Sequence, residues 1–301
     1  MSKRDLISIF DLRKAEIDGL IKEAVKLKKE KKRTPPLKGK TLAMIFEKSS
    51  TRTRISFEVG MYQLGGTALF LNSNDLQLSR GETIRDTART ISRYVDAVML
   101  RTFAHDNVVQ LADAASVPVI NGLSDLSHPC QILSDLLTVY EKKGDYKKLT
   151  YAYIGDGNNV LNSWLEAAGV LGIKLNIATP ESHKPPQAVL KKAMAMSPES
   201  ITLCHTPVDA VRNADVVYTD VWVSMGQENV RMEKLKAFAG FQINGALLQH
   251  AGSDAIVMHC LPAHRGEEIT SEVLDGRQSV VFDQAENRLH MQKAILKFLI
   301  K

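Results

Sequence analysis

The alternation of strand-like and helix-like segments constrains the fold of this chain more than any other feature. Short apolar runs at 41–46 and 97–101 are typical of buried strands, and helix-like segments follow both of them. The other expected strands are 67–71, 117–121, 150–154, 174–178, 216–219, 255–258 and 280–282. The expected helices are 11–29, 83–94, 106–116, 131–140, 158–171, 186–196 and 286–299, with one more that ends at Gly65. Strands that alternate with helices form parallel sheets, so the sequence predicts an α/β fold.

A charged, glycine-containing stretch at 142–148 separates two such series of strands and helices. With 301 residues, the chain is long enough for two domains of ordinary size. We therefore expect two doubly wound parallel-sheet domains, at 1–143 and 144–285, with a C-terminal helix at 286–301 that packs back on the first. Ligands of open parallel sheets bind beyond the carboxyl ends of the strands, where polar residues gather in both halves. The pattern predicts an active-site cleft between the domains.

Composition and charge disfavour several classes of protein. The hydrophobic content of 44% and the charged content of 24% are those of a globular protein, and no apolar run is long enough for a membrane span. The net charge is +5, but lysines crowd the segment 22–33, which favours a solvated helix face over a nucleic-acid surface. Three cysteines do not suggest a disulfide framework, and no signal peptide is recognisable. We expect a cytoplasmic protein with neither nucleic-acid nor membrane partners.

A group of hydroxyl and guanidinium side chains follows the first expected strand. The group consists of Ser50, Thr51, Arg52, Thr53 and Arg54. Because a helix begins here, free backbone N–H groups and the positive end of the helix dipole point toward the same place. That combination suits a phosphate dianion, although an ordinary capped helix with solvated arginines is the alternative. We expect Arg54 to point away from the phosphate and to pair with an acidic neighbour.

The segment His128-Pro129-Cys130-Gln131 opens another expected helix. Proline suits the first helical position, because its missing N–H would have no partner there. His128 would then cap the helix, close to the positive end of the dipole, where a neutral imidazole is favoured. A neutral histidine beside Gln131 could form hydrogen bonds with a polarised carbonyl group.

A third polar group, His259-Cys260-Leu261-Pro262-Ala263-His264, follows the expected strand 255–258. Cys260 would lie at the end of this strand, unless it is a small buried hydrophobe, which is the commoner state of a free thiol. Zinc binding by His259, Cys260 and His264 is a further interpretation. Since no CxxC pair and no HxxxH spacing supports it, we expect no metal.

Two other functions have some support in the sequence. Gly155-Asp156-Gly157 lies between an expected strand and helix, as in a dinucleotide-binding fingerprint. Val160 replaces the third glycine, which disfavours a dehydrogenase. A noncatalytic phosphate-binding module would explain the segment 50–54, but it would leave Asp220, Ser224 and Cys260 without a role.

Together, in this order and at this spacing, the three polar motifs resemble the aspartate/ornithine transcarbamoylase family from the first helix to the last. His259-Cys260-Leu261-Pro262 and Ser224-Met225-Gly226 resemble the branch that uses ornithine, and Cys130 is usually another residue in the aspartate branch. The resemblance implies transfer of the carbamoyl group of carbamoyl phosphate to the δ-amine of L-ornithine, giving L-citrulline and phosphate. It implies a first domain that binds carbamoyl phosphate, a second that binds L-ornithine, and no cofactor.

The resemblance also implies roles for individual residues. Those expected to bind carbamoyl phosphate are Ser50, Thr51, Arg52, Thr53, Gln77, Arg101, His128, Pro129, Cys130, Gln131, Cys260, Leu261 and Arg288. Those expected to bind ornithine are Asn159, Asp220, Ser224 and Met225. Those expected to be catalytic are Arg101, His128, Asp220 and Cys260. Thr53, Arg101 and His128 would form an oxyanion site, and a cis Leu261–Pro262 peptide would aim the Leu261 carbonyl at the carbamoyl NH2 group.

The family implies direct attack by the amine, without an acyl-cysteine, and a departing phosphate that accepts the proton. It implies a homotrimer or a multiple of trimers, in which a loop near 76–82 reaches the neighbouring subunit's site. Members work in arginine biosynthesis or in ornithine-yielding catabolism, and both roles stay open here.

Overall fold

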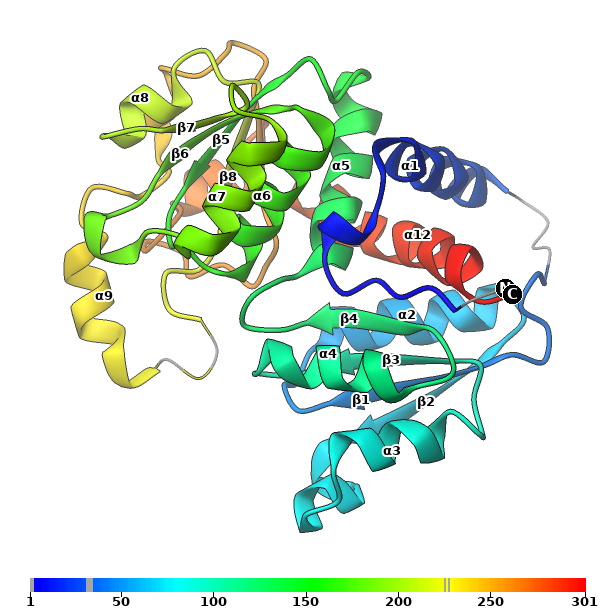
Figure 1. Ribbon diagram of the computed structural model, residues 1–301. Helices are drawn as coiled ribbons and strands as arrows, with labels where there is room; N and C mark the ends of the chain where they lie inside the picture. Colours follow the sequence, from blue (N-terminus) through cyan, green and yellow to red (C-terminus); the bar gives the residue numbers. More distant parts are fainter. Residues whose placement is uncertain (1–2, 31–34, 225, 227) are drawn as a thin grey trace. The chain divides into compact units, whose positions relative to one another are not determined.

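The computed structural model describes residues 3–30, 35–224, 226 and 228–301, with backbone only at 78, 79 and 228 (Figure 1). The chain divides into two compact units, Met1–Leu137 with Glu286–Lys301, and Thr138–Ala285. Each unit contains one parallel sheet with helices packed around it, which confirms the predicted α/β fold class.

The sheet of the first unit has four parallel strands in the order β2-β1-β3-β4. Its strands are β1 (Thr41–Phe46), β2 (Thr67–Asn72), β3 (Ala97–Arg101) and β4 (Val119–Leu123). Its helices are η1 (Ile9–Asp11), α1 (Lys14–Lys29), α2 (Thr51–Gln63), η2 (Ser73–Asp75), η3 (Gln77–Arg80), α3 (Ile84–Ile91) and α4 (His105–Ala114). The chain crosses from β2 on one side of β1 to β3 on the other, and ligands of open α/β sheets bind beside such a reversal.

The sheet of the second unit has five parallel strands in the order β7-β6-β5-β8-β9. Its strands are β5 (Thr150–Ile154), β6 (Lys174–Ala178), β7 (Ile201–Leu203), β8 (Val216–Thr219) and β9 (Ile256–His259). Its helices are α6 (Asn159–Leu171), η4 (Glu181–His183), α7 (Gln187–Met196), α8 (Pro207–Val211), η5 (Glu228–Val230), α9 (Arg231–Ala237), α10 (Gly245–Leu248) and α11 (Ser271–Leu274). Here the strand order reverses at β5. Two helices, α5 (Pro129–Lys143) and α12 (Val281–Leu299), run from one unit into the other.

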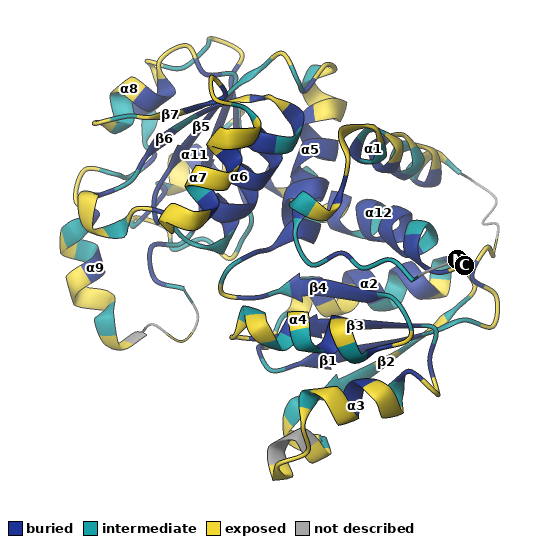
Figure 2. Ribbon diagram, viewed as in Figure 1, coloured by how far each residue is buried: buried dark blue, intermediate teal, exposed yellow. Residues whose placement is uncertain are grey.

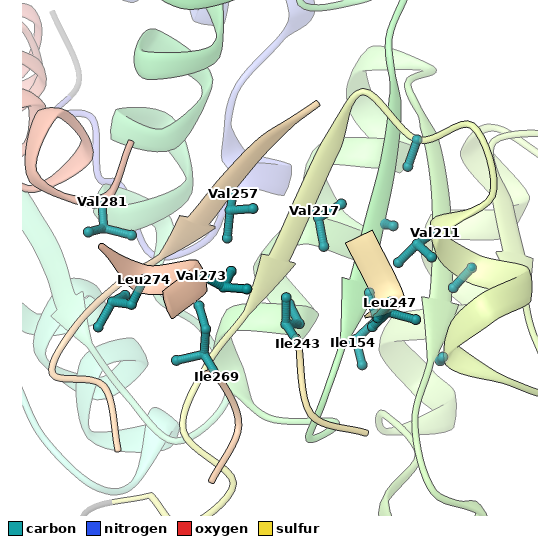
Figure 3. Packing of buried hydrophobic residues seen from close by; sticks show 14 residues of the cluster. Ile154, Val211, Val217, Ile243, Leu247, Val257, Ile269, Val273, Leu274 and Val281 are labelled. Carbon is teal, nitrogen blue, oxygen red and sulfur yellow. The ribbon is translucent and has the colours of Figure 1, made fainter. Parts of the chain in front are cut away.

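The inner strands β3 (Figure 2) and β8 are buried along their whole length, as expected for parallel strands covered by helices. In the second unit, Ile154, Val217 and Val257 from three adjacent strands share one core cluster with α8, α10 and α11 (Figure 3). These cores hold the strand ends in place, so the polar residues that follow the strands start from rigid positions.

The expected secondary structure differs from the observed one in a wrong strand, in the strand β7 and in the short helices α8, α9, α10 and α11, which were not predicted. The strand predicted at 280–282 is wrong, because α12 begins at Val281 and only Ser279 forms a bridge, to Val257. β7 was not predicted, since three residues carry too short a pattern. None of the described helices is long and apolar enough to cross a membrane.

Candidate active site

In the first unit, the start of α2 lies directly after β1 and has the geometry of a capped helix. Ser50 is the N-cap residue, and its hydroxyl accepts a hydrogen bond from the Thr53 N–H at 3.2 Å. Thr51 and Arg52 are the first two helical residues, at the positive end of the dipole. The Arg54 Nε donates to Glu58 at 3.0 Å, and its guanidinium carbon lies 3.8 Å from the centre of the Phe70 ring. The predicted pairing of Arg54 with an acidic neighbour is therefore confirmed.

Two buried arginines converge on the Thr53 hydroxyl. Arg101, the last residue of β3, places Nη1 at 3.5 Å from Thr53 Oγ1, and Arg288 of α12 places Nη2 at 3.2 Å. The Arg101 Nε also donates to the Lys48 carbonyl, at 3.2 Å. The Arg288 Nη1 donates to the Gln131 side chain at 2.5 Å. Two guanidinium groups held this closely form a site that favours an anion.

His128 lies beside these arginines, immediately before α5, with Pro129 at the first helical position. Its carbonyl accepts from the Gln131 N–H at 3.1 Å, which is N-cap geometry. Burial and then the nearby charges of Arg288, Arg101 and Arg52 hold the pKa of the His128 imidazole well below its ordinary 6.5. The imidazole is therefore neutral at physiological pH, as predicted, although burial and three cations cause the shift rather than the helix dipole.

Two of the residues predicted to bind carbamoyl phosphate, Cys130 and Gln77, lie in different surroundings from the others. The Cys130 side chain is fully buried, with Sγ 3.5 Å from the Asn121 carbonyl, and burial raises the pKa of this thiol to about 12. Gln77 is exposed in η3, within the segment expected to reach a neighbouring subunit. Their roles stay predictions.

In the second unit, the ends of β8 and β9 bring Asp220 and Cys260 together. The Cys260 thiol donates to Asp220 Oδ1 at 2.8 Å, so it is a polar partner of a carboxylate rather than an isolated hydrophobe. Asp220 Oδ2 accepts from the Asn158 side chain at 2.7 Å. Asn158 also caps α6, through an Oδ1 that accepts from the Val160 N–H at 2.9 Å. Sequence reasoning missed Asn158, although an asparagine before a helix is a recognisable cap.

His259 orients the chain beyond Cys260. Its Nε2 is 3.0 Å from Glu268 Oε1, and its Nδ1 accepts the Leu261 N–H at 2.9 Å. Because an amide N–H can only donate, the ring proton lies on Nε2. Both ring nitrogens are therefore used, which makes His259 a poor zinc ligand. The Leu261–Pro262 peptide is cis, as the resemblance implied.

A buried ion pair supports the segment after Asp220. The Lys234 ammonium of α9 donates to Asp156 Oδ2 at 2.6 Å and to the Trp222 carbonyl at 2.9 Å. Sequence reasoning missed this lysine. Ser224 is half-buried at the end of the supported segment, and the predicted ligand Met225 lies outside the described residues. Asn159 is the first residue of α6, next to the Asn158 cap.

Comparison with known proteins gives the same family over both units. Residues 4–141 match the model of the aspartate/ornithine carbamoyltransferase carbamoyl-P binding domain, and residues 147–299 match that of its Asp/Orn binding domain. An ornithine carbamoyltransferase of Syntrophus aciditrophicus is 57% identical, over 99% of this chain and 100% of its own.

Solved structures agree. The ornithine carbamoyltransferase from Pyrococcus furiosus is 54% identical with a TM-score of 0.95, over 99% of this chain and 97% of its own. The ornithine transcarbamoylase from Giardia lamblia is 34% identical with a TM-score of 0.91, over 100% of this chain and 99% of its own. On the shared fold, the two matched domains and these identities, the chain belongs to the aspartate/ornithine carbamoyltransferase family.

Proposed function

We propose that this chain transfers the carbamoyl group of carbamoyl phosphate to the δ-amine of L-ornithine, giving L-citrulline and phosphate. The observation that carries the choice of acceptor is the Asp220–Cys260 pair, at 2.8 Å. A carboxylate at this place attracts an amino group and repels the second carboxylate that distinguishes aspartate from a basic amino acid. The names of the relatives point to the same acceptor.

The first unit holds carbamoyl phosphate in this proposal. Backbone N–H groups and hydroxyls of Ser50, Thr51 and Thr53, with the Arg52 guanidinium, bind the phosphate at the N-terminus of α2. Arg101 and a neutral His128 donate to the carbamoyl oxygen together with Thr53. A well-placed donor of this kind lowers an acyl-transfer barrier by ~3–4 kcal/mol.

Further groups fix the rest of carbamoyl phosphate. Gln131 and the Leu261 carbonyl accept from the carbamoyl NH2 group, while Arg288 positions Gln131 through the bond described above. Pro129 and Cys130 contribute through the backbone at the start of α5, because the Cys130 thiol is buried away from solvent. Gln77 serves a neighbouring subunit's phosphate, and the enzyme is a homotrimer or a multiple of trimers.

The second unit holds ornithine. Asn159 binds the α-carboxylate, while Ser224 and Met225 close over the extended side chain. Asp220 and Cys260 orient the δ-amine toward the carbamoyl carbon, and the Asp220 carboxylate accepts hydrogen bonds from its N–H groups. The amine nitrogen forms a bond with the carbamoyl carbon, the bond between that carbon and the phosphate oxygen breaks, and the departing phosphate takes the proton of the amine. Because the amine is itself the nucleophile, no carbamoyl group is carried by Cys260.

A comparison of acceptor amines tests the proposal. The chain is assayed at saturating carbamoyl phosphate with ornithine, putrescine, lysine and aspartate, and we expect ornithine to have the highest kcat/KM. Arg52→Gln raises KM for carbamoyl phosphate, whereas the matched control Arg54→Gln, on the same helix but paired with Glu58, leaves it unchanged. A higher kcat/KM with aspartate overturns the acceptor assignment. A carbamoyl group trapped on Cys260 overturns direct attack.

We infer the same cellular setting as for the family, that of a cytoplasmic enzyme of arginine metabolism, in arginine biosynthesis or in ornithine-yielding catabolism.

A further inference from the structure

A second group of ionisable side chains lies in the turn that follows Pro262, outside the residues assigned to either substrate. One ring nitrogen of His264 and one carboxylate oxygen each of Glu267 and Glu268 all lie within 4.8 Å of one another. The Oε1 of Glu268 has two partners, His259 Nε2 at 3.0 Å and the His264 N–H at 2.6 Å. The Oε1 of Glu267 accepts from the Arg231 guanidinium. One oxygen of each of the two carboxylates, Oε1, thus has a hydrogen-bond partner.

The remaining atoms of the group are buried and unsatisfied. His264 Nδ1, Glu267 Oε2 and Glu268 Oε2 have no hydrogen-bond partner among the residues that the structure describes. The Glu268 side chain is 0% exposed, so its second oxygen is out of reach of bulk water. The Nδ1 of His264 is 3.7 Å from Glu267 Oε2, too far for a hydrogen bond. Buried polar atoms without a partner are unfavourable, and a cation or an ordered water molecule bound at this turn would satisfy them.

We propose that His264 Nδ1, with one oxygen each from Glu267 and Glu268, binds a divalent first-row metal ion, for which Zn²⁺ is the best match. One imidazole and two carboxylates are a zinc donor set, whereas Ca²⁺ and Mg²⁺ prefer oxygen ligands alone. Ligands about 2.1 Å from a tetrahedral ion lie about 3.4 Å apart, within the observed limit. A water molecule completes the coordination. This site differs from the zinc interpretation of the sequence, since it shares only His264 and uses no cysteine.

The turn that carries the three ligands is held in place by the backbone. Gly266 has a φ of +88°, which allows the chain to reverse between His264 and Glu267. Its N–H donates to the Ile269 carbonyl at 2.9 Å. The Gln242 side chain donates to the carbonyls of Gly266 and Glu267, at 2.8 and 2.9 Å. A preformed turn lowers the entropic cost of assembling a metal site.

Binding at this place stabilises the second unit rather than taking part in carbamoyl transfer. Glu268 is fully buried and bonds to His259, which in turn holds the Leu261 N–H. A metal ion bound to Glu268 fixes this carboxylate and satisfies polar atoms that are otherwise buried without a partner in the folded state. The unfolded chain loses the site, so metal binding raises the midpoint of unfolding.

A cobalt titration of the tag-free chain tests the site. The protein is treated with a chelator and titrated with Co²⁺, in the wild type and in Cys260→Ser. We expect one equivalent of Co²⁺ with d–d absorption bands and no thiolate-to-cobalt charge-transfer band in both forms. Zn²⁺ displaces the Co²⁺, and the midpoint of thermal unfolding rises. These readouts do not depend on carbamoyl transfer.

Variants assign the ligands. His264→Ala lowers the affinity for Co²⁺ at least ~10-fold, and so does Glu267→Gln, which is less buried than Glu268 and thus safer for folding. His250→Ala removes an exposed histidine elsewhere in the second unit and leaves the affinity unchanged. Wild-type affinity in His264→Ala, no binding at millimolar Co²⁺, or binding that disappears in Cys260→Ser would each overturn the proposal.

Discussion

Replacement of Lys234 by methionine should destabilise the second unit far more than a surface substitution. Methionine keeps most of the apolar stem of the lysine, but it leaves the buried Asp156 carboxylate without its ammonium partner at 2.6 Å. Removing one member of a buried ion pair typically costs ~3–5 kcal/mol. The Trp222 carbonyl also loses its donor at 2.9 Å, which adds about 1 kcal/mol.

We therefore expect Lys234→Met to lower the free energy of unfolding by ~4–6 kcal/mol. For a unit of this size, the midpoint of thermal unfolding should fall by roughly 8–20 °C. Tryptophan fluorescence in urea monitors the unfolding of the second unit, because the two tryptophans of the chain, Trp164 and Trp222, both lie there. Lys236→Met, at an exposed position of the same helix, is the matched control and should change stability by less than about 0.5 kcal/mol.

A second substitution separates the lost ion pair from lost packing. In the double variant Asp156→Asn with Lys234→Met, the unpaired charge is gone, so most of the stability should return. A loss below about 1 kcal/mol in Lys234→Met, or a double variant as unstable as the single one, would refute this reasoning. Since Lys234 also holds Trp222, we expect the single variant to raise KM for ornithine more than KM for carbamoyl phosphate.

Three further predictions concern protonation, reactivity and packing. The folded state keeps His128 neutral, whereas the unfolded chain protonates it near pH 6.5. The contribution of His128 to stability is therefore complete above that pH and falls below it, by up to ~1.4 kcal/mol per pH unit. In denaturant titrations at pH 5 and 7, His128→Gln should remove this part of the pH dependence of stability, and an unchanged pH dependence would contradict the assignment. Iodoacetamide mapping at pH 8 should leave Cys130 unmodified until denaturant is added, because the thiol is fully buried with a pKa of about 12; early alkylation at Cys130 would show that the helix start opens. Gly157→Ala should cost ~1–3 kcal/mol in urea unfolding, since the added methyl would lie 2.5–2.6 Å from the backbone of residues 183–185; wild-type stability would mean that this loop moves away freely.

Local patterns in the sequence determined most of the secondary structure and the positions of the polar motifs. Apolar runs located eight of the nine strands in the described part of the chain, because such a strand needs little information beyond its own residues and the breaks around them. Hydroxyl and proline signals located the helix starts at Ser50 and Pro129, since caps and first-turn residues act within a few positions. The neutral state of His128 was also predictable, though for an incomplete reason.

Tertiary structure alone decided which side chains meet. Thr53 and Arg288 are 235 residues apart, and Asn158 and Asp220 are 62 apart, yet both pairs are hydrogen-bonded. No periodic pattern encodes such pairs, because they depend on strand order and on how far each helix runs past the sheet. The same holds for the Lys234–Asp156 ion pair and for Glu268, whose polar partners become obligatory only when folding removes water from around them.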